Sequence, residues 1–192
     1  MKFGEIIILN GTSSAGKTSI LIELQKIMNP PYLNAGFDKF IWMLPHRCLK
    51  RPLWYEVMGH ANKAGQIGHQ LASGMHHAIV ALAKAGNNVI ADHVLVEQQW
   101  LDECVNLFSD LHAFFIGVKC PLEVVQQRER DRKNRTIGIA KAQYDLVHRH
   151  NIYDFEVDTS IATPEECAWK IKKRVEEGSP PNAFKRIKQL QE

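Results

Sequence analysis

The residues best suited to chemistry lie near the start of the chain, where two glycines stand close to a lysine and a hydroxyl side chain. Gly11, Gly16, Lys17 and Thr18 fit the spacing G-x-x-x-x-G-K-T, after an apolar run and before a helical pattern. In this context the glycines let backbone N–H groups turn inward around a phosphate group, and the helix start adds partial positive charge. The segment therefore predicts a phosphate-binding loop. The residues that we expect to bind the nucleotide are Gly11, Thr12, Ser13, Ser14, Ala15, Gly16, Lys17, Thr18 and Ser19.

Two side chains of this loop have predicted roles of their own. We expect Lys17 to contact the β and γ phosphates of ATP, which makes it a predicted catalytic residue, and the Thr18 hydroxyl to ligate Mg²⁺. A glycine- and serine-rich connection without a ligand is the alternative. The apolar run, the spacing, the Lys-Thr pair and the helical pattern all favour phosphate binding. ATP and Mg²⁺ are therefore the predicted cofactors.

Two aspartates each follow a run that predicts a strand. Asp38 comes shortly after residues 32–35, and Asp92 ends the apolar run at residues 88–92. In open parallel sheets, ligands bind at the carboxyl ends of the strands. We expect Asp92 to lie near Thr18 and to hold Mg²⁺, and Asp38 to face the acceptor and take its proton as the general base. A helix N-cap is an alternative role for Asp38.

A strongly basic helical pattern follows residue 121. Arg128, Arg132 and Arg135 are spaced i, i+4 and i+7, so they share one face of a helix. Three guanidinium groups on one face predict a phosphate clamp, in which Arg128 contacts the nucleotide while Arg132 and Arg135 act on the transferred phosphate. A solvated charged helix, with Glu129 and Asp131 as local partners, is the alternative.

An apolar segment without clean periodicity lies at about residues 37–62. A long irregular insert in a small α/β domain usually lines or covers a site. Its aromatic and sulfur side chains favour an aromatic or apolar acceptor, although packing under a loop is the alternative for each of them. Besides Asp38, the side chains predicted to contact the acceptor are Phe40, Trp42, Met43 and Trp54, together with His93, which follows Asp92 and is expected to orient the acceptor.

Five apolar runs predict strands, and helical patterns separate them. The expected strands are residues 3–10, 32–35, 88–92, 111–118 and 153–158, and the expected helices are residues 19–28, 39–44, 62–85, 97–108, 121–135, 139–150 and 163–177. The alternation predicts one α/β domain over residues 1–192, a three-layer fold with a five-stranded parallel sheet. Thr163 to Glu166 predict a capping box. In the helix expected at residues 62–85, Gly65, Gly68 and Gly74 predict close packing or a ligand against that face.

The composition predicts a soluble globular protein that stays in the cytoplasm. The 24 basic and 21 acidic side chains leave a net charge of +3, which is too balanced to indicate nucleic-acid or membrane binding. The four cysteines are scattered and form no C-x-x-C, which fits a reducing compartment. The short apolar run before the glycine-rich loop matches neither a signal peptide nor a membrane span. The predicted partner is a small-molecule alcohol acceptor, and no nucleic acid or membrane is expected to bind. Whether the chain forms a homo-oligomer is not decided by the sequence.

Blocks of sequence from the first strand to the last helix resemble the chloramphenicol phosphotransferase family of small P-loop kinases. These blocks are residues 8–19, 36–38 with Phe40 and residues 43–45, 90–94, 117–123, 128–130 and 153–160. The resemblance implies a nucleoside monophosphate kinase-like P-loop fold with an Arg-bearing lid at about residues 128–140. It also implies ATP-dependent phosphorylation of an alcohol, with Asp38 as the general base; the type member phosphorylates the primary hydroxyl of chloramphenicol, which inactivates the antibiotic.

The sequence does not identify the acceptor. Residues 46–62 do not match the family, and their basic side chains His46, Arg47, Lys50 and Arg51 fit either an anionic acceptor or an exposed solubilising patch. A sugar, a nucleoside or another metabolite alcohol is therefore the nearest alternative to chloramphenicol. A nucleotide-dependent switch or a nucleic-acid-associated ATPase is the alternative of a different class. The guanine-binding motif N-K-x-D is missing, because residues 62–65 read Asn-Lys-Ala-Gly.

Overall fold

The computed structural model describes residues 2–50, 64–132 and 137–191, and within them five strands form one parallel sheet. The strands lie in the order β2-β3-β1-β4-β5. Their bounds are β1 (Ile6–Asn10), β2 (Tyr32–Asn34), β3 (Asn88–His93), β4 (Ala113–Lys119) and β5 (Phe155–Asp158). The predicted α/β fold with a five-stranded parallel sheet is confirmed.

Strand β1 lies at the centre of the sheet, because four apolar residues in a row, Ile6 to Leu9, can be buried on both faces, and the amide group of the buried Asn10 is hydrogen-bonded. Every residue of β1 is buried, as expected for a strand covered by helices on both sides. Its register pairs Leu9 with Asp92 of β3 and Asn10 with both His93 of β3 and Gly117 of β4. The carboxyl ends of the three middle strands therefore meet at one edge, where the glycine-rich loop begins.

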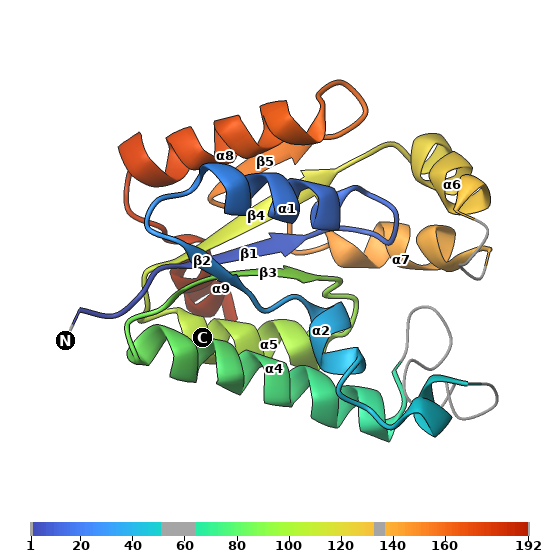
Figure 1. Ribbon diagram of the computed structural model, residues 1–192, viewed down its shortest axis with the longest axis horizontal. Coiled ribbons are helices and arrows are strands. Elements are labelled where there is room, and N and C mark those ends of the chain that lie inside the picture. Colours follow the sequence, from blue (N-terminus) through green and yellow to red (C-terminus); the bar gives the residue numbers. More distant parts are fainter. Residues whose placement is uncertain (1, 51–63, 133–136, 192) are drawn as a thin grey trace.

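Helices cover both faces of this sheet (Figure 1). On one face lie α1 (Lys17–Ile27) and α8 (Pro164–Glu177), and on the other lie α4 (Gln66–Lys84), α5 (Gln98–Phe108) and α9 (Ala183–Gln191). Each face of the sheet has its own apolar core, and successive side chains of β1 point into them alternately. Ile7 and Leu9 pack in the core on the α1 side, and Ile6 and Ile8 pack in the core on the α4 side. These helices cover the faces of the sheet, and the predicted phosphate-binding loop lies at the carboxyl ends of its strands.

Four shorter elements gather beyond that edge, on the right of Figure 1. They are α2 (Phe37–Ile41), the 3₁₀ helix η1 (His46–Leu49), α6 (Leu122–Asp131) and α7 (Ile139–Val147). Helices α1 and α8 pack closely on one another, and α8 begins with the predicted capping box, in which Thr163 and Glu166 exchange side-chain and backbone hydrogen bonds. No helix among the described residues is long and apolar enough to cross a membrane.

Several local expectations differ from the structure. Strand β1 begins at Ile6 and not at residue 3, and α7 ends at Val147 and not at residue 150. Gly36, not Asp38, is the N-cap residue of α2, so the N-cap alternative for Asp38 is wrong. Helix α6 ends at Asp131 with Arg132 as its C-cap residue, so the expected helix to residue 135 stops early. In α4, Gly65 is the N-cap residue, and a Cβ atom at the exposed Gly74 would meet no heavy atom within 4 Å, so the expected close packing is wrong there. Two residues with predicted roles in the site, Trp54 and Arg135, lie outside the described residues.

Candidate active site

The glycine-rich loop connects β1 to α1 at the carboxyl edge of the sheet. A Cβ atom at Gly11 would lie 2.5 Å from the carbonyl oxygen of Val118, so only glycine lets the loop pass this close to β4. Gly16 has a φ of +91°, in the left-handed region that favours glycine, and it is the N-cap residue of α1. These positions form the turn that the sequence predicts, and residues 11–19 lie together in the loop and the first turn of α1.

Lys17 is folded back into this loop. The residue is 7% exposed, and its Nζ atom donates hydrogen bonds to the backbone carbonyl oxygens of Gly11 (2.8 Å) and Thr12 (2.7 Å). The ammonium charge is therefore held against the loop, where the phosphates of a nucleotide would be stronger, anionic acceptors. The contact of Lys17 with ATP stays a prediction.

Two other side chains of the loop indicate that a ligand belongs there. Ser13 and Ser14 are buried, and their Oγ atoms have no hydrogen-bond partner within the part of the chain that the structure describes. A buried hydroxyl group without a partner costs roughly 1–3 kcal/mol. Phosphate oxygens would accept hydrogen bonds from both hydroxyls, so the residues present fit a nucleotide.

Thr18 and Asp92 form the second part of the site. The Thr18 Oγ1 atom donates a hydrogen bond of 2.6 Å to Asp92 Oδ2, although 74 residues separate the two in the chain. The pairing of Leu9 with Asp92 places this carboxylate beside the start of α1. A hydroxyl and a carboxylate at a phosphate-binding loop are the oxygen ligands that Mg²⁺ takes in P-loop enzymes. The predicted closeness of Thr18 and Asp92 is present, and their metal role stays a prediction.

Asp38 lies at the same edge of the sheet because the chain enters α2 at Gly36, close to Asp92. A Cβ atom at Gly36 would lie 2.0 Å from Asp92 Oδ1, so a larger residue there would displace this carboxylate. Asp38 follows two residues later, exposed in the first turn of α2. The two aspartates therefore come from neighbouring elements at one edge of the sheet, as the sequence predicts.

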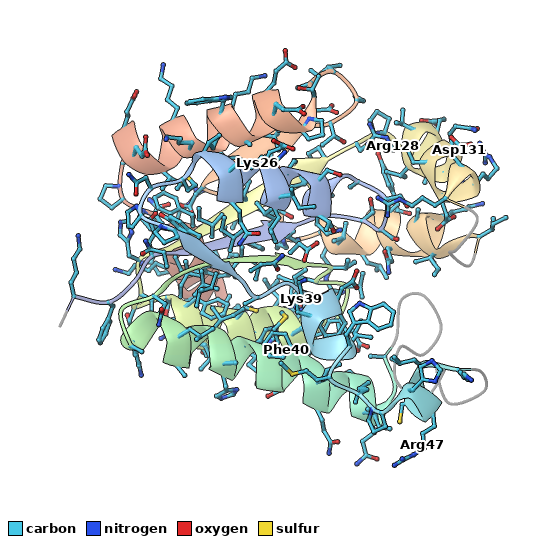
Figure 2. The ribbon with its side chains drawn as sticks, in the orientation of Figure 1. Lys26, Lys39, Phe40, Arg47, Arg128 and Asp131 are labelled. Carbon is cyan, nitrogen blue, oxygen red and sulfur yellow. The ribbon has the colours of Figure 1, made fainter. Side chains whose placement is uncertain are left out.

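The residues predicted to contact the acceptor differ in their exposure. Phe40 is half-buried and packs against the core between α2 and α4, whereas Trp42 is 70% exposed and Met43 is 71% exposed. Figure 2 shows Phe40 on the side of α2 toward α4, and Arg47 of η1 pointing away from the body of the molecule. Trp42 and Met43 thus present apolar surface beside Asp38 that the fold does not bury.

Arg128 is anchored to the loop that follows β5. It donates hydrogen bonds to Thr159, from NH1 to Oγ1 (2.9 Å) and from NH2 to the carbonyl oxygen (2.7 Å). Thr159 Oγ1 in turn donates to the carbonyl oxygen of Ala15 (2.9 Å). Arg128 is thereby linked to the phosphate-binding loop. Arg132 is exposed just beyond the end of α6.

Three further residues support the site and were not predicted for it. The buried Gln143 of α7 accepts a hydrogen bond from the backbone N–H of Ser13 (2.9 Å). Glu129, expected as a surface partner of the arginines, is 1% exposed and accepts backbone hydrogen bonds from Gly138 (2.7 Å) and Ala140 (2.9 Å) at the start of α7. Thr159 and Glu129 lie in blocks of the sequence that carry the family resemblance, which was the available signal for them; Gln143 lies in none of these blocks.

His93 lies at the end of β3, directly after Asp92, and is 2% exposed. Its Nδ1 atom accepts a hydrogen bond from the backbone N–H of Val94 (2.7 Å), and its Nε2 atom lies 2.9 Å from Nε2 of His76 on α4. Both ring nitrogens are therefore engaged with protein groups, and the ring is buried. Its predicted contact with the acceptor stays a prediction.

Comparison with known proteins shows the family to which the chain is related. The family model described as "Chloramphenicol phosphotransferase-like protein" matches residues 4–176. A curated protein of Mycobacterium tuberculosis, named "Putative O-phosphotransferase", is 31% identical over 201 aligned positions, which cover 98% of this chain and 89% of that protein.

Solved structures of kinases share the fold. An APS kinase of Mycobacterium tuberculosis, in complex with AMPPNP and APS, superposes with a TM-score of 0.64 at 15% identity, covering 92% of this chain and 100% of that one. A shikimate kinase of Acinetobacter baumannii, in complex with shikimate, superposes with a TM-score of 0.63 at 14% identity, covering 91% of this chain and 94% of that one. At these identities the likeness shows the P-loop kinase fold alone.

Proposed function

The chain belongs to the chloramphenicol phosphotransferase-like protein family and is a phosphotransferase enzyme, and from this premise we propose that it transfers the γ-phosphate of ATP to the hydroxyl group of a small molecule. The observation that carries the proposal is the pairing of Thr18 with Asp92 beside a loop whose buried hydroxyls of Ser13 and Ser14 have no partner among the described residues. That combination fits a triphosphate with its metal ion.

Each group has a proposed task in this reaction. Residues 11–19 hold the phosphates through backbone N–H groups, and Lys17 neutralises charge on the β and γ phosphates. Thr18 and Asp92 would hold Mg²⁺, which supplies charge neutralisation and orients the phosphates. Arg128 contacts the nucleotide, and Arg132 and Arg135 stabilise the transferred phosphate.

Asp38 is the proposed general base. Its carboxylate accepts the proton of the acceptor hydroxyl while the oxygen of that hydroxyl bonds to the γ-phosphorus of ATP; the bond from that phosphorus to the oxygen that bridges the β and γ phosphates breaks, and ADP leaves. The support for this role is its place in the first turn of α2, two residues after the contact of Gly36 with Asp92. We further propose that the insert at about residues 37–62 lines the acceptor and that residues at about 128–140 form the lid.

The proposed acceptor is an alcohol with an apolar or aromatic body, of the kind that chloramphenicol represents, because Trp42 and Met43 expose apolar surface next to Asp38. An acidic alcohol, such as a phosphorylated sugar or nucleoside, is the second candidate. It is favoured by the exposed basic side chains His46, Arg47 and Lys50 at η1.

A screen of ADP release over hydroxyl compounds tests the proposal. The panel contains chloramphenicol, neutral sugars, nucleosides and their phosphorylated forms, each with Mg²⁺ and ATP. ADP release that needs one of these alcohols supports a kinase, and the compound that supports it identifies the acceptor class. Slow ADP release at the same rate with every compound and with none would indicate a nucleotide switch or ATPase and would overturn the proposal.

A further inference from the structure

A buried row of polar side chains leads from the surface of α5 to the end of β3. It consists of Glu103 on α5, His76 on α4 and His93, and we name it the Glu-His-His row. His76 is 0% exposed and His93 is 2% exposed, whereas the Glu103 side chain is 26% exposed and lines a cavity of about 450 Å³ together with Ser73 and Trp100. The row therefore has one end near solvent and the other beside Asp92.

Hydrogen bonds in the row run in one direction. The Val94 N–H donates to Nδ1 of His93, so this nitrogen carries no proton, and in the neutral ring the proton lies on Nε2. That proton is donated to Nε2 of His76 at 2.9 Å. His76 therefore carries its own proton on Nδ1, which donates to Oε2 of Glu103 at 2.5 Å. Each ring is thereby limited to one tautomer.

The charge states agree with this direction. Burial lowers the pKa of His76, so its ring is neutral near pH 7, and the hydrogen bond that Nδ1 of His93 accepts from Val94 leaves that nitrogen without a proton. Burial also acts to raise the pKa of Glu103, but hydrogen bonds from Ser73 and His76 outweigh it and lower the pKa overall. Glu103 is therefore an anion that accepts the His76 proton, and the Ser73 hydroxyl fixes its other oxygen.

The inner end of the row touches both predicted catalytic elements. The His93 ring stacks on Phe37, with ring centroids 5.4 Å apart and planes 9° apart. Phe37 is the first residue of α2 and directly precedes Asp38, while Asp92 directly precedes His93. Trp100 packs against both rings, at 5.5 Å from His93 and 6.1 Å from Phe37. A rotation of the His93 ring would therefore disturb the start of α2 and the end of β3 together.

We infer that Glu103 and His76 are positioning residues that fix the tautomer and orientation of His93, and thereby hold Asp92 and the Phe37–Asp38 start of α2 in their relative places. The inference rests on the proposed function for its effect on turnover, but the arrangement itself can be measured without it. Supporting residues of this kind typically change activity about 10- to 100-fold when they are lost.

Substitutions at Glu103 test the row without creating a cavity in the core, because the Glu103 side chain is partly exposed. In Glu103→Gln the amide oxygen still accepts from His76 and the Ser73 hydroxyl can turn to accept from the amide, so we expect turnover within about threefold of the original protein. In Glu103→Leu the His76 N–H loses its acceptor, and we expect turnover to fall roughly 10-fold or more while ATP affinity is unchanged. Gln99→Leu is the matched control, because Gln99 lines the same cavity on α5 but lies outside the row.

Side-chain nitrogen NMR on the ligand-free protein provides the independent readout. We expect a proton on Nε2 of His93 and on Nδ1 of His76, and we expect Glu103→Leu, but not Gln99→Leu, to shift the amide resonances of residues 36–38 and 92–94. The opposite tautomers, or equal turnover and unmoved amides in Glu103→Leu, would overturn the inference. If the tautomers and amide shifts are as expected but no alcohol supports ADP release, the proposed function fails and the row stands.

Discussion

The nucleotide side of this molecule differs from its acceptor side in how the chain places its polar groups. On the nucleotide side, the register of Leu9 with Asp92 and the left-handed φ of Gly16 determine where Thr18 and its partner lie. On the acceptor side, Asp38, Trp42 and Met43 are exposed on a short helix and its end. Backbone geometry thus determines the phosphate site, whereas the acceptor site depends on side chains at the surface.

The largest expected effect is on the nucleotide side. Lys17→Ala removes the cation of the loop, so we expect turnover to fall by roughly 10²- to 10³-fold and ATP binding to weaken. Lys26→Ala, at the exposed end of the same helix, is the control and should leave both unchanged. Steady-state kinetics and calorimetric titration with ATP measure the two effects. Equal behaviour of the two variants would contradict the predicted role of Lys17.

Asp38→Asn separates the two sides of the site. The amide cannot take the acceptor proton, so we expect turnover to fall roughly 10²-fold or more while ATP binding stays nearly intact. Turnover and ATP affinity measured on the same protein check this expectation. Asp110→Asn, in the exposed turn after α5, serves as the control. If Asp38→Asn turned over acceptor as fast as the original protein, Asp38 would not be the base.

A pair of glycine substitutions tests the junction between the two sides. Gly36→Ala places a Cβ atom 2.0 Å from Asp92 Oδ1, so we expect the carboxylate to move and Mg²⁺ activation to require about 10-fold more metal ion. Gly74→Ala in α4 meets no heavy atom within 4 Å, so we expect unchanged activity and a gain of about 0.5–1 kcal/mol in the free energy of unfolding. Magnesium titrations and denaturant unfolding measure these effects. Equal magnesium dependence in both variants would show that Gly36 does not position Asp92.

The smallest effect is expected at the acceptor surface. Trp42 is 70% exposed, so Trp42→Ala should leave the free energy of unfolding within about 0.5 kcal/mol of its original value. If its ring contacts the acceptor, the KM for the alcohol rises several-fold while the KM for ATP is unchanged, because an exposed aromatic contact contributes about 1 kcal/mol. An unchanged acceptor KM would remove Trp42 from the acceptor site and weaken the contrast between the two sides.

The sequence predicts the nucleotide side well because its determinants are local. Apolar runs identify the strands, and the spacing of Gly11, Gly16, Lys17 and Thr18 lies within eight consecutive positions. Asp92 could be predicted because a parallel sheet brings the ends of its strands to one edge. The capping box at Thr163 is likewise a pattern of neighbours.

The parts that could not be predicted depend on contacts between distant residues. Spacing along α6 suggests a shared arginine face, but Arg128 is held by Thr159, 31 residues away. The sequence suggests that Glu129 is a surface charge, but in the structure it accepts hydrogen bonds from the backbone at the start of α7. His76 has an ordinary place in a helical pattern, and its partners His93 and Glu103 lie on a strand and on another helix. Such partners are determined by packing, and no local pattern reports them.

The most direct test of the central claim is the stoichiometry of products. The protein is incubated with Mg²⁺, ATP and the alcohol that supports ADP release, and ADP and phosphorylated alcohol are quantified by mass spectrometry. We expect one phosphorylated alcohol for each ADP, and neither product above background in Lys17→Ala. Accumulation of ADP and free phosphate without a phosphorylated alcohol would contradict the account.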